Sequence, residues 1–504
     1  MTLQEYLAGS AASFPNKIAL RCGAERSSYQ ELARQSDSLA SFLLHHGLQR
    51  GDRVVIFLEN STQAVVSIFG VLKAGGCFVP LNPTSPSQTL EFVVQHSGAK
   101  ILISSAAKHE MISRVKLNWT ERPQIVLTGA SSDDESITRF EEACRTPILP
   151  SFPSVVDLDL AAIIYTSGST GIPKGVTFTH RNIDTVVSSV AQYLEHSNQD
   201  VVLGVLQLSF GYGLLQVLVT FRTGGRIVLE KGFGLPYDII NRIREEGVTG
   251  LAGVPTLFAL LLQLKTLGEE DLSSVRYVTN AAAALPPSFV PRIKHAFPHA
   301  KLYLMHGLTE CLRTTFLPPD EVERRPTSVG KGMPNVELWL EDERGSRLST
   351  GQVGELFVRG SNVMLGYWND PVATERVLRP GRYPHERVLR TGDLFRIDED
   401  GFFYFVSRKD EVIKSRGEKV SPVEIENVIY HLEEVSEVRV VGIPDEILGQ
   451  AIKAEIVLKE GTTLSERSVK AFCKTRLEEY KIPHLVAFVA TLPKTSGGKI
   501  KRLA

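Results

Sequence analysis

The sequence has few of the features that mark secreted, metal-binding or nucleic-acid-binding proteins. It contains 5 cysteines among 504 residues, an odd number without the spacing of a metal-ligand pair, so reduced cytosolic thiols are the simple interpretation. Lysine and arginine (56) almost balance aspartate and glutamate (57), which argues against a nucleic acid partner held by a broad basic surface. Residues 1–5 carry neither the basic nor the apolar region of a signal peptide. We expect a cytoplasmic protein.

Long uncharged runs are also scarce. Residues 201–221 carry no charged side chain and are long enough to cross a bilayer. However, Gln207, Ser209, Gln216 and three glycines make this segment a poor membrane span. We therefore expect a buried strand, turn and helix there, and no membrane-spanning segment.

The chain is too long for one hydrophobic core, so two or more domains are expected. Apolar runs at 53–58, 77–81 and 101–104 alternate with helical patterns at 62–74 and 87–95, and Ser28 with Glu31 has the spacing of a capping box. This alternation predicts a mostly parallel sheet with helices on both faces, continuing to about residue 360. Residues 130–153 are polar, acidic and proline-bearing, which predicts a linker or flap.

The pattern changes near Asp410 to that of a small α+β unit. Helices are expected at 424–432 and 464–479, and strands at 438–442 and 451–458. Roughly 95 residues are enough to fold alone. The predicted fold class is α/β, with a large N-terminal domain (1–408) of layered, mostly parallel sheets and helices, and a small C-terminal α+β domain (409–504).

Residues 165–176 read YTSGSTGIPKGV and follow an apolar run that predicts a buried strand. Glycines let backbone N–H groups approach an anion, and Lys174 adds a positive charge. The segment is not a Walker P-loop, which needs glycine at Pro173 and serine or threonine at Gly175. A polar surface loop is the alternative, but the density of donors favours phosphate binding. The hydroxyl donors are Thr166, Ser167, Ser169 and Thr170.

Two carboxylates follow strands or turns in positions that suit a ligand. Glu310 comes just after the apolar run 302–305, where α/β folds place ligands, and could hold Mg²⁺ against a triphosphate. Its neighbour Thr309 could donate to the α-phosphate. Asp393 follows Gly392 and can accept two hydroxyl hydrogen bonds, as a ribose diol offers. The alternative for Glu310 is an ordinary strand-to-loop turn with a solvated glutamate. The alternative for Asp393 is an Asx-turn.

Together these segments resemble the motifs of the adenylate-forming (AMP-binding) enzymes, which include acyl-CoA synthetases, peptide-synthetase adenylation domains and luciferases. The matches occur in the family's order and extend over nearly the whole chain, at 73–83, 165–176, 306–310, 390–394, 407–417 and 496–499. The chain looks most like a stand-alone AMP-dependent acyl-CoA or acyl-carrier ligase. It departs from the family at His306, where tyrosine is usual, and at Ser407, where glycine is usual.

The resemblance implies roles for particular residues. It implies that Lys499 bridges the substrate carboxylate and the α-phosphate, with Thr309 and Glu310 as further catalytic residues and Glu310 as the metal ligand. It makes Asp410 the hinge. It implies that Lys414 and Gly417 face the site during thioester formation. The implied ATP- or AMP-binding residues are Thr166, Ser167, Gly168, Ser169, Thr170, Gly171, Lys174, Ala282, Ala283, Ala284, His306, Gly307, Asp393 and Arg408.

The implied reaction is attack of a carboxylate on the α-phosphate of ATP, giving acyl-AMP and pyrophosphate, followed by transfer to a thiol. The thiol is coenzyme A or the phosphopantetheine of a carrier, which we expect to be a separate protein because no carrier domain follows Lys499. Gly211 stands where amino-acid-activating members have aspartate, which argues against an α-amino acid. The expected acyl pocket suits an apolar or aromatic acid and consists of Phe210, Gly211, Tyr212, Leu215 and Gly253.

The sequence leaves two alternatives open. One is a stand-alone adenylation enzyme that loads an amino acid or another acid onto a separate carrier protein. The other is a non-catalytic nucleotide-binding or scaffold protein with the same fold. The presence of Lys174, Glu310 and Lys499 together argues against it.

Overall fold

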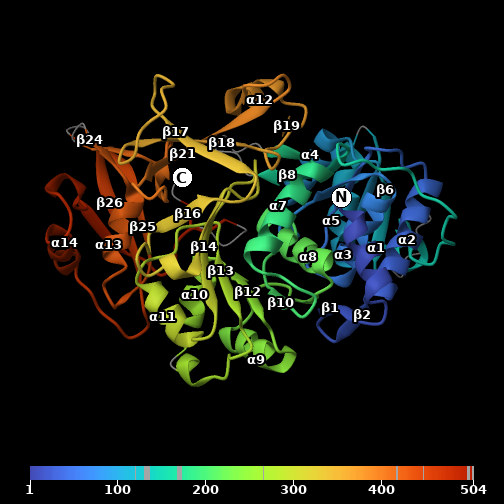
Figure 1. Ribbon diagram of the computed structural model, residues 1–504, viewed down its shortest axis with the longest axis horizontal. Helices are drawn as coiled ribbons and strands as arrows, with labels where there is room; N and C mark the ends of the chain where they lie inside the picture. Colours follow the sequence, from blue (N-terminus) through green and yellow to red (C-terminus); the bar gives the residue numbers. More distant parts are fainter. Residues whose placement is uncertain are drawn as a thin grey trace.

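The computed structural model describes residues 1–119, 121–129, 137–166, 173–264, 266–415, 418–445, 448–495 and 500–501. Within these ranges the chain forms two large sheets and one small sheet. Figure 1 shows the small sheet at the opposite end of the molecule from the N-terminal helices, with the second half of the large domain between them.

The first large sheet has eight strands in the order β19-β9-β8-β4-β3-β5-β6-β7. Neighbours from β8 to β7 run parallel, whereas β9 is antiparallel to both β8 and β19. Parallel strands covered on both faces read as apolar runs, which is why the sequence predicted them. The strands are β3 (Arg53–Ile56), β4 (Cys77–Pro80), β5 (Ile101–Ser105), β6 (Gln124–Thr128), β7 (Ile137–Arg139), β8 (Leu160–Thr166), β9 (Lys174–Thr179) and β19 (Gly366–Tyr367).

The second large sheet has 14 strands within the described ranges. Its parallel half is β1 (Ile18–Cys22), β10 (Val201–Gly204), β11 (Arg226–Leu229), β12 (Gly250–Gly253), β13 (Tyr277–Asn280) and β14 (Lys301–His306), with β2 (Glu25–Ser28) antiparallel to β1. Its antiparallel half is β15 (Thr315–Leu317), β16 (Ser328–Gly332), β17 (Val336–Glu341), β18 (Val353–Gly360), β20 (Leu378–Pro380), β21 (Arg387–Ile397) and β22 (Phe403–Arg408).

This second half corrects the predicted strand–helix alternation, which holds only as far as β14. Beyond it the strands pair antiparallel, and α12 (Pro371–Val377) is the α-helix among them in the described part. Antiparallel neighbours need no long crossover connection, so the chain can return directly after a short turn. The predicted linker at 130–153 is also wrong in part, because residues 137–143 form β7 and α6 (Phe140–Ala143).

Helices cover the large sheets in layers. One core joins both sheets through α1 (Gln4–Ser13), α2 (Tyr29–His45), α3 (Thr62–Lys73), α7 (His180–Tyr193) and α8 (Gly211–Thr223). The outer face of the first sheet packs on α4 (Ser87–Ser97) and α5 (His109–Val115). The outer face of the parallel half of the second sheet packs on α9 (Pro236–Glu246), α10 (Pro255–Leu261) and α11 (Phe289–Ala296). The predicted α/β architecture is therefore confirmed.

The predicted local signals at the N-terminal end of α2 and in residues 201–221 are also confirmed. The capping box forms between Ser28 and Glu31. Residues 201–221 fold as β10, a turn and the buried helix α8. In the part of the chain that the structure describes, no helix is both long and apolar enough to cross a membrane.

The C-terminal unit has its own sheet and core. Its strands are β23 (Ile413–Ser415), β24 (Glu418–Val420), β25 (Val435–Asp445), β26 (Gly449–Leu458) and β27 (Leu485–Phe488), covered by α13 (Pro422–Ile429) and α14 (Glu466–Lys474). It touches the large domain where Ser288 Oγ donates to the Tyr430 carbonyl (3.2 Å) and where Lys419 Nζ lies 2.9 Å from Glu343 Oε1. The boundary near Asp410 stays a prediction.

Candidate active site

Tyr367 connects two residues that the sequence assigned to phosphate and metal binding. Its hydroxyl donates to Glu310 Oε1 (2.7 Å), and Lys174 Nζ lies 5.1 Å from the centroid of its ring. The pairing of β19 with β9 places Tyr367 opposite Val176, two residues after Lys174. Burial, followed by the charge of Glu310, raises the pKa of Tyr367, so the phenol stays protonated and donates. Sequence reasoning missed Tyr367.

Asp393 lies at the centre of a second group. It is buried on β21, and its Oδ2 is 3.1 Å from His306 Nε2. The other ring nitrogen, Nδ1, is 2.8 Å from Thr314 Oγ1. The register of β21 and β22 sets Arg408 directly opposite Asp393, with Arg408 Nε 3.7 Å from Asp393 Oδ1. Three residues predicted to bind nucleotide therefore lie together.

The charge of Arg408 connects the two groups. Its side chain is 51% exposed, and burial of the remainder opposes its charge, yet Asp393, Asp410, Glu411 and Glu310 together raise the pKa of Arg408. The hinge candidate Asp410 is its neighbour, with Oδ1 3.4 Å from Arg408 Nε. The guanidinium of Arg408 thus interacts electrostatically with both carboxylates that the sequence singled out, Glu310 and Asp393.

The His306 ring is enclosed by two aromatic side chains that the sequence did not single out. Phe395 lies edge-on, with ring centroids 5.0 Å apart, and Phe405 lies 6.1 Å away. Both imidazole nitrogens have partners within the chain. The expected contact between His306 and adenine stays a prediction.

The expected adenine segment follows β13 in a constrained conformation. Ala282 has φ +74°, a left-handed conformation that costs a residue with a Cβ about 1–2 kcal/mol. Asn280 Nδ2 holds the turn by donating to the Ala283 carbonyl (3.0 Å). Ala283 and Ala284 are exposed. At Gly307 a Cβ would collide with the Leu312 carbonyl oxygen, so close packing of the backbone requires this glycine.

The residues of the expected acyl pocket pack around the start of α8. A Cβ at Gly211 would lie 2.6 Å from Leu312 Cδ2, so a larger residue there would require the end of the Leu312 side chain to move. Tyr212 is half-buried against Arg313, and its hydroxyl lies 2.6 Å from Thr279 Oγ1. Burial raises the pKa of Tyr212 to about 12. Leu215 is buried and Phe210 is half-buried before the helix.

Gly253 belongs to the same region but has a packing role of its own. It ends β12, and a Cβ there would lie 2.6 Å from Phe258 Cζ on α10. Its carbonyl accepts from the Ala281 N–H (3.3 Å). Close packing therefore accounts for this glycine without a ligand.

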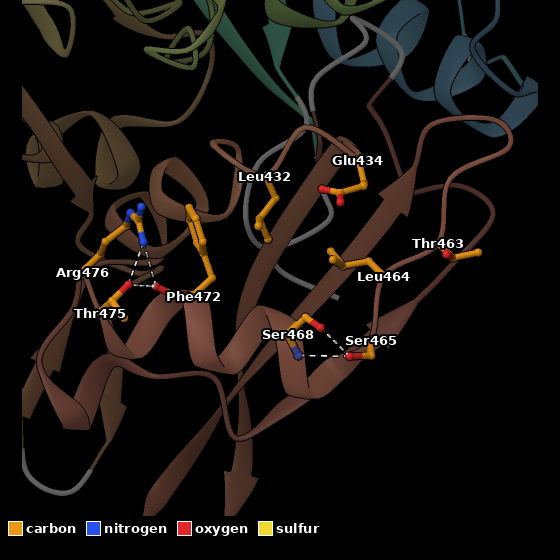
Figure 2. Close-up of a pocket in the computed structure, with 9 residues that line it drawn as sticks. All are labelled: Leu432, Glu434, Thr463, Leu464, Ser465, Ser468, Phe472, Thr475 and Arg476. Atoms are coloured by element: carbon orange, nitrogen blue, oxygen red, sulfur yellow. Dashed lines mark hydrogen bonds between the residues drawn. The ribbon is translucent and has the colours of Figure 1, made fainter.

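The pocket in Figure 2 lies on the C-terminal unit, away from these groups. It measures about 820 Å³, and another of about 490 Å³ lies near Trp339. Neither contains a residue that the sequence singled out, so we assign no role to either. The first is lined by Leu432, Glu434, Thr463, Leu464, Ser465, Ser468, Phe472, Thr475 and Arg476.

Other predicted residues lie apart or outside the described ranges. Thr166 ends β8 opposite Lys174, and Thr309 is half-buried beside Glu310. Lys414 is exposed on β23, and its N–H donates to Gln450 Oε1 (2.7 Å). Seven residues lie outside the described ranges and stay predictions: Ser167, Gly168, Ser169, Thr170, Gly171, Gly417 and Lys499.

Comparison with known proteins agrees with this arrangement. Residues 7–368 match the AMP-binding enzyme family, and residues 424–499 match the AMP-binding enzyme C-terminal domain. The chain therefore belongs to the AMP-binding enzyme family. The predictions of this family and of an AMP-forming acid–thiol ligase are confirmed.

Several relatives match almost end to end. The chain is 32% identical to a long-chain-fatty-acid–CoA ligase of Bacillus subtilis (strain 168), over 99% of this chain and 93% of the relative. It is also 32% identical to 4-coumarate–CoA ligase 3 of Arabidopsis thaliana, over 100% of this chain and 90% of the relative. The crystal structure of the anthranilate CoA ligase AuaEII in complex with anthranoyl-AMP superposes with a TM-score of 0.92 at 26% identity, covering 99% and 95% of the two chains.

Proposed function

We propose that this enzyme activates a carboxylic acid with ATP and transfers the acyl group to coenzyme A. The observation that carries the proposal is the convergence of Lys174, Glu310, Asp393 and Arg408, which come from β9, the turn after β14, β21 and β22. Two cations and two carboxylates in this arrangement suit a triphosphate with a ribose and a divalent cation.

Each group has a defined task in the proposed reaction. The carboxylate of Asp393 accepts the ribose hydroxyls, and His306 holds this carboxylate in position through its Nε2 atom. Lys174 and Arg408 supply positive charge along the phosphates. A carboxylate oxygen of the acid attacks the α-phosphorus, and the bond to the leaving pyrophosphate breaks. Lys499 stabilises the charge that develops between the two reactants.

The residues present fit a magnesium ion. Mg²⁺ commonly binds nucleotides through one or two carboxylates together with phosphate oxygens, and Glu310 can supply one such carboxylate. Tyr367 fixes Oε1 of Glu310, which orients this carboxylate. When bound, Mg²⁺ would neutralise charge on the phosphate oxygens.

The thiol step follows from the same acyl-AMP. The sulfur attacks the acyl carbon, AMP leaves, and the thiol proton passes to solvent. We propose that the C-terminal domain (409–504) turns about Asp410, so that Lys414 and Gly417 face the site in this step. Asp410 lies in the short turn between β22 and β23, where a change in a few backbone torsions can rotate the domain.

We propose an apolar or aromatic acid without an α-amino group. Gly211 carries no side chain, so this position offers no carboxylate to balance a substrate ammonium. Coenzyme A is the proposed acceptor because the matched relatives are named CoA ligases. Loading of a separate carrier protein is the second candidate, and no observation on this chain favours it.

ATP–pyrophosphate exchange with a panel of fatty, aryl and amino acids tests the proposal. Exchange with fatty or aryl acids is expected, whereas exchange with amino acids alone would refute the proposed substrate class. Lys499→Ala should abolish adenylation, and Lys494→Ala is its matched control because Lys494 Nζ pairs with Glu437. Adenylation by Lys499→Ala within a few-fold of wild type would refute the lysine's role. Mass spectrometry of thioesters formed with coenzyme A or with purified carriers identifies the acceptor.

A further inference from the structure

Arg313 is a buried cation without a counter-charge in the described part of the chain. The residue is 2% exposed, and its Nε is buried without a hydrogen-bond partner. Its guanidinium carbon lies 5.1 Å from the centroid of the Tyr212 ring. A guanidinium stays protonated in proteins, and a buried charge without a partner is costly.

Other poorly exposed arginines of this chain are paired with carboxylates. Arg325 shows the contrast best, because its side chain is 10% exposed and also lies over an aromatic ring, that of Phe402 at 4.2 Å. Yet Arg325 pairs with Glu321, Asp398 and Asp400. Further paired examples, with side chains 14–19% exposed, are Arg21, Arg226 and Arg439.

The backbone fixes Arg313 beside the start of α8. Its carbonyl accepts from Asn362 Nδ2 (2.8 Å), and the preceding residue, Leu312, has φ +60° and would contact a Cβ at Gly211. The Tyr212 hydroxyl is in turn held by Thr279. The guanidinium opposes the rise in the pKa of Tyr212 that burial causes, so its charge reaches the expected acyl pocket.

We propose that Arg313 is a specificity residue that pairs with a second carboxylate on the acid substrate, at the end remote from the reacting carboxyl. The planar guanidinium fork matches a carboxylate in two parallel hydrogen bonds, and such a pair would balance the buried charge. This inference rests on the proposed function and narrows its substrate class to dicarboxylic acids with an apolar or aromatic body.

Matched acids that differ only in the second carboxylate test this assignment. Exchange rates are compared for adipate against hexanoate and for terephthalate and isophthalate against benzoate. Wild type should prefer a dicarboxylic member, and Arg313→Met should lower that preference by about 10- to 100-fold, as expected for hydrogen bonds to a charged group. Arg313→Lys keeps the charge without the fork, and should retain more of the preference than Arg313→Met.

Arg325→Met is the matched control. It removes a guanidinium of similar burial, leaves three carboxylates unpaired, and should lower the melting temperature without changing the preference among acids. Arg313→Met should not lower the melting temperature, because no carboxylate loses its partner. Without ATP, the preferred dicarboxylic acid should raise the melting temperature of wild type and not that of Arg313→Met.

The outcomes separate this inference from the function it rests on. A wild-type preference for the monocarboxylic members, or an equal preference in wild type and in both Arg313 variants, would overturn the role of Arg313 and leave the ligase activity standing. Failure of every acid to support exchange would overturn the proposed function and this inference with it.

Discussion

His306 Nε2 and Asp393 Oδ2 lie 3.1 Å apart, although 87 residues separate them in the sequence. The histidine ends a parallel strand, and the aspartate lies within an antiparallel one. Thr314 contacts the other imidazole nitrogen. The ring is thus held at both nitrogens, and one edge of it supports the carboxylate that we propose for ribose binding.

Replacing His306 tests this support. His306→Phe keeps an aromatic ring against Phe395 but removes the contact with Asp393, so we expect the KM for ATP to rise about 5- to 10-fold, as for one lost hydrogen bond. Steady-state exchange kinetics measure the change. Phe405→Leu leaves both imidazole contacts in place and should alter this KM less. An unchanged KM in His306→Phe would show that Asp393 needs no support from the ring.

The proposed contact between Asp393 and the ribose hydroxyls can be tested with a nucleotide that lacks them. Wild type should bind 2′,3′-dideoxy-ATP about 10- to 100-fold more weakly than ATP, because the carboxylate loses its hydroxyl donors. Asp393→Ala should weaken ATP binding and bind the two nucleotides almost equally. Asp398→Asn changes a carboxylate just after the end of β21 that is bonded to Arg325 and Tyr404, and should retain the discrimination. Full discrimination in Asp393→Ala would assign the ribose to other residues.

Short motifs in the sequence predicted the residues whose role is local. The capping box at Ser28 and Glu31 and the buried apolar strands of the first sheet are set by neighbours in the chain, and they lie where the pattern indicated. The order of motifs also predicted the family. These signals need no knowledge of tertiary contacts.

Residues whose role arises from distant contacts were not predictable in this way. Tyr367 acquires its role from Glu310, 57 residues away, and from the pairing of β19 with β9. Arg313 stands out only because it is buried without a carboxylate, which depends on how the chain folds around it. The antiparallel strands after β14 were missed because their paired register, not a repeated strand–helix pattern, defines them.

The hydrogen bond from Tyr367 to Glu310 predicts the magnesium requirement. Tyr367→Phe leaves the carboxylate without this donor and less well oriented, so half-maximal exchange should need about 3- to 10-fold more Mg²⁺. Tyr165→Phe is the control, because that hydroxyl contacts His96 Nδ1 at 2.8 Å and not Glu310. Titration of exchange activity with Mg²⁺ at saturating ATP measures the shift. Equal Mg²⁺ curves for Tyr367→Phe and wild type would contradict a metal-orienting role.

His180 is a buried titratable group outside the candidate site. It begins α7, is 1% exposed, and its Nδ1 accepts the Leu3 N–H at 3.0 Å. Burial, partly opposed by Asp159 and Glu5, lowers the pKa of His180 from 6.5 to about 4. Between pH 6.5 and about pH 4, His180 is therefore protonated in the unfolded chain but neutral in the native state. The stability from neutral His180 is complete above pH 6.5 and is lost as the pH falls to about 4.

His180→Gln should therefore flatten the acid side of the stability curve. Glutamine can accept the Leu3 N–H but does not titrate, so the variant avoids a loss of roughly 3 kcal/mol between pH 6.5 and 4. Thermal unfolding midpoints from pH 8 to 4 measure this difference, with the exposed His299→Gln as control. Part of the slope should remain in His180→Gln, because burial also lowers the pKa of His196 to about 4. Parallel curves for His180→Gln and wild type over this range would show that His180 is protonated in the native state.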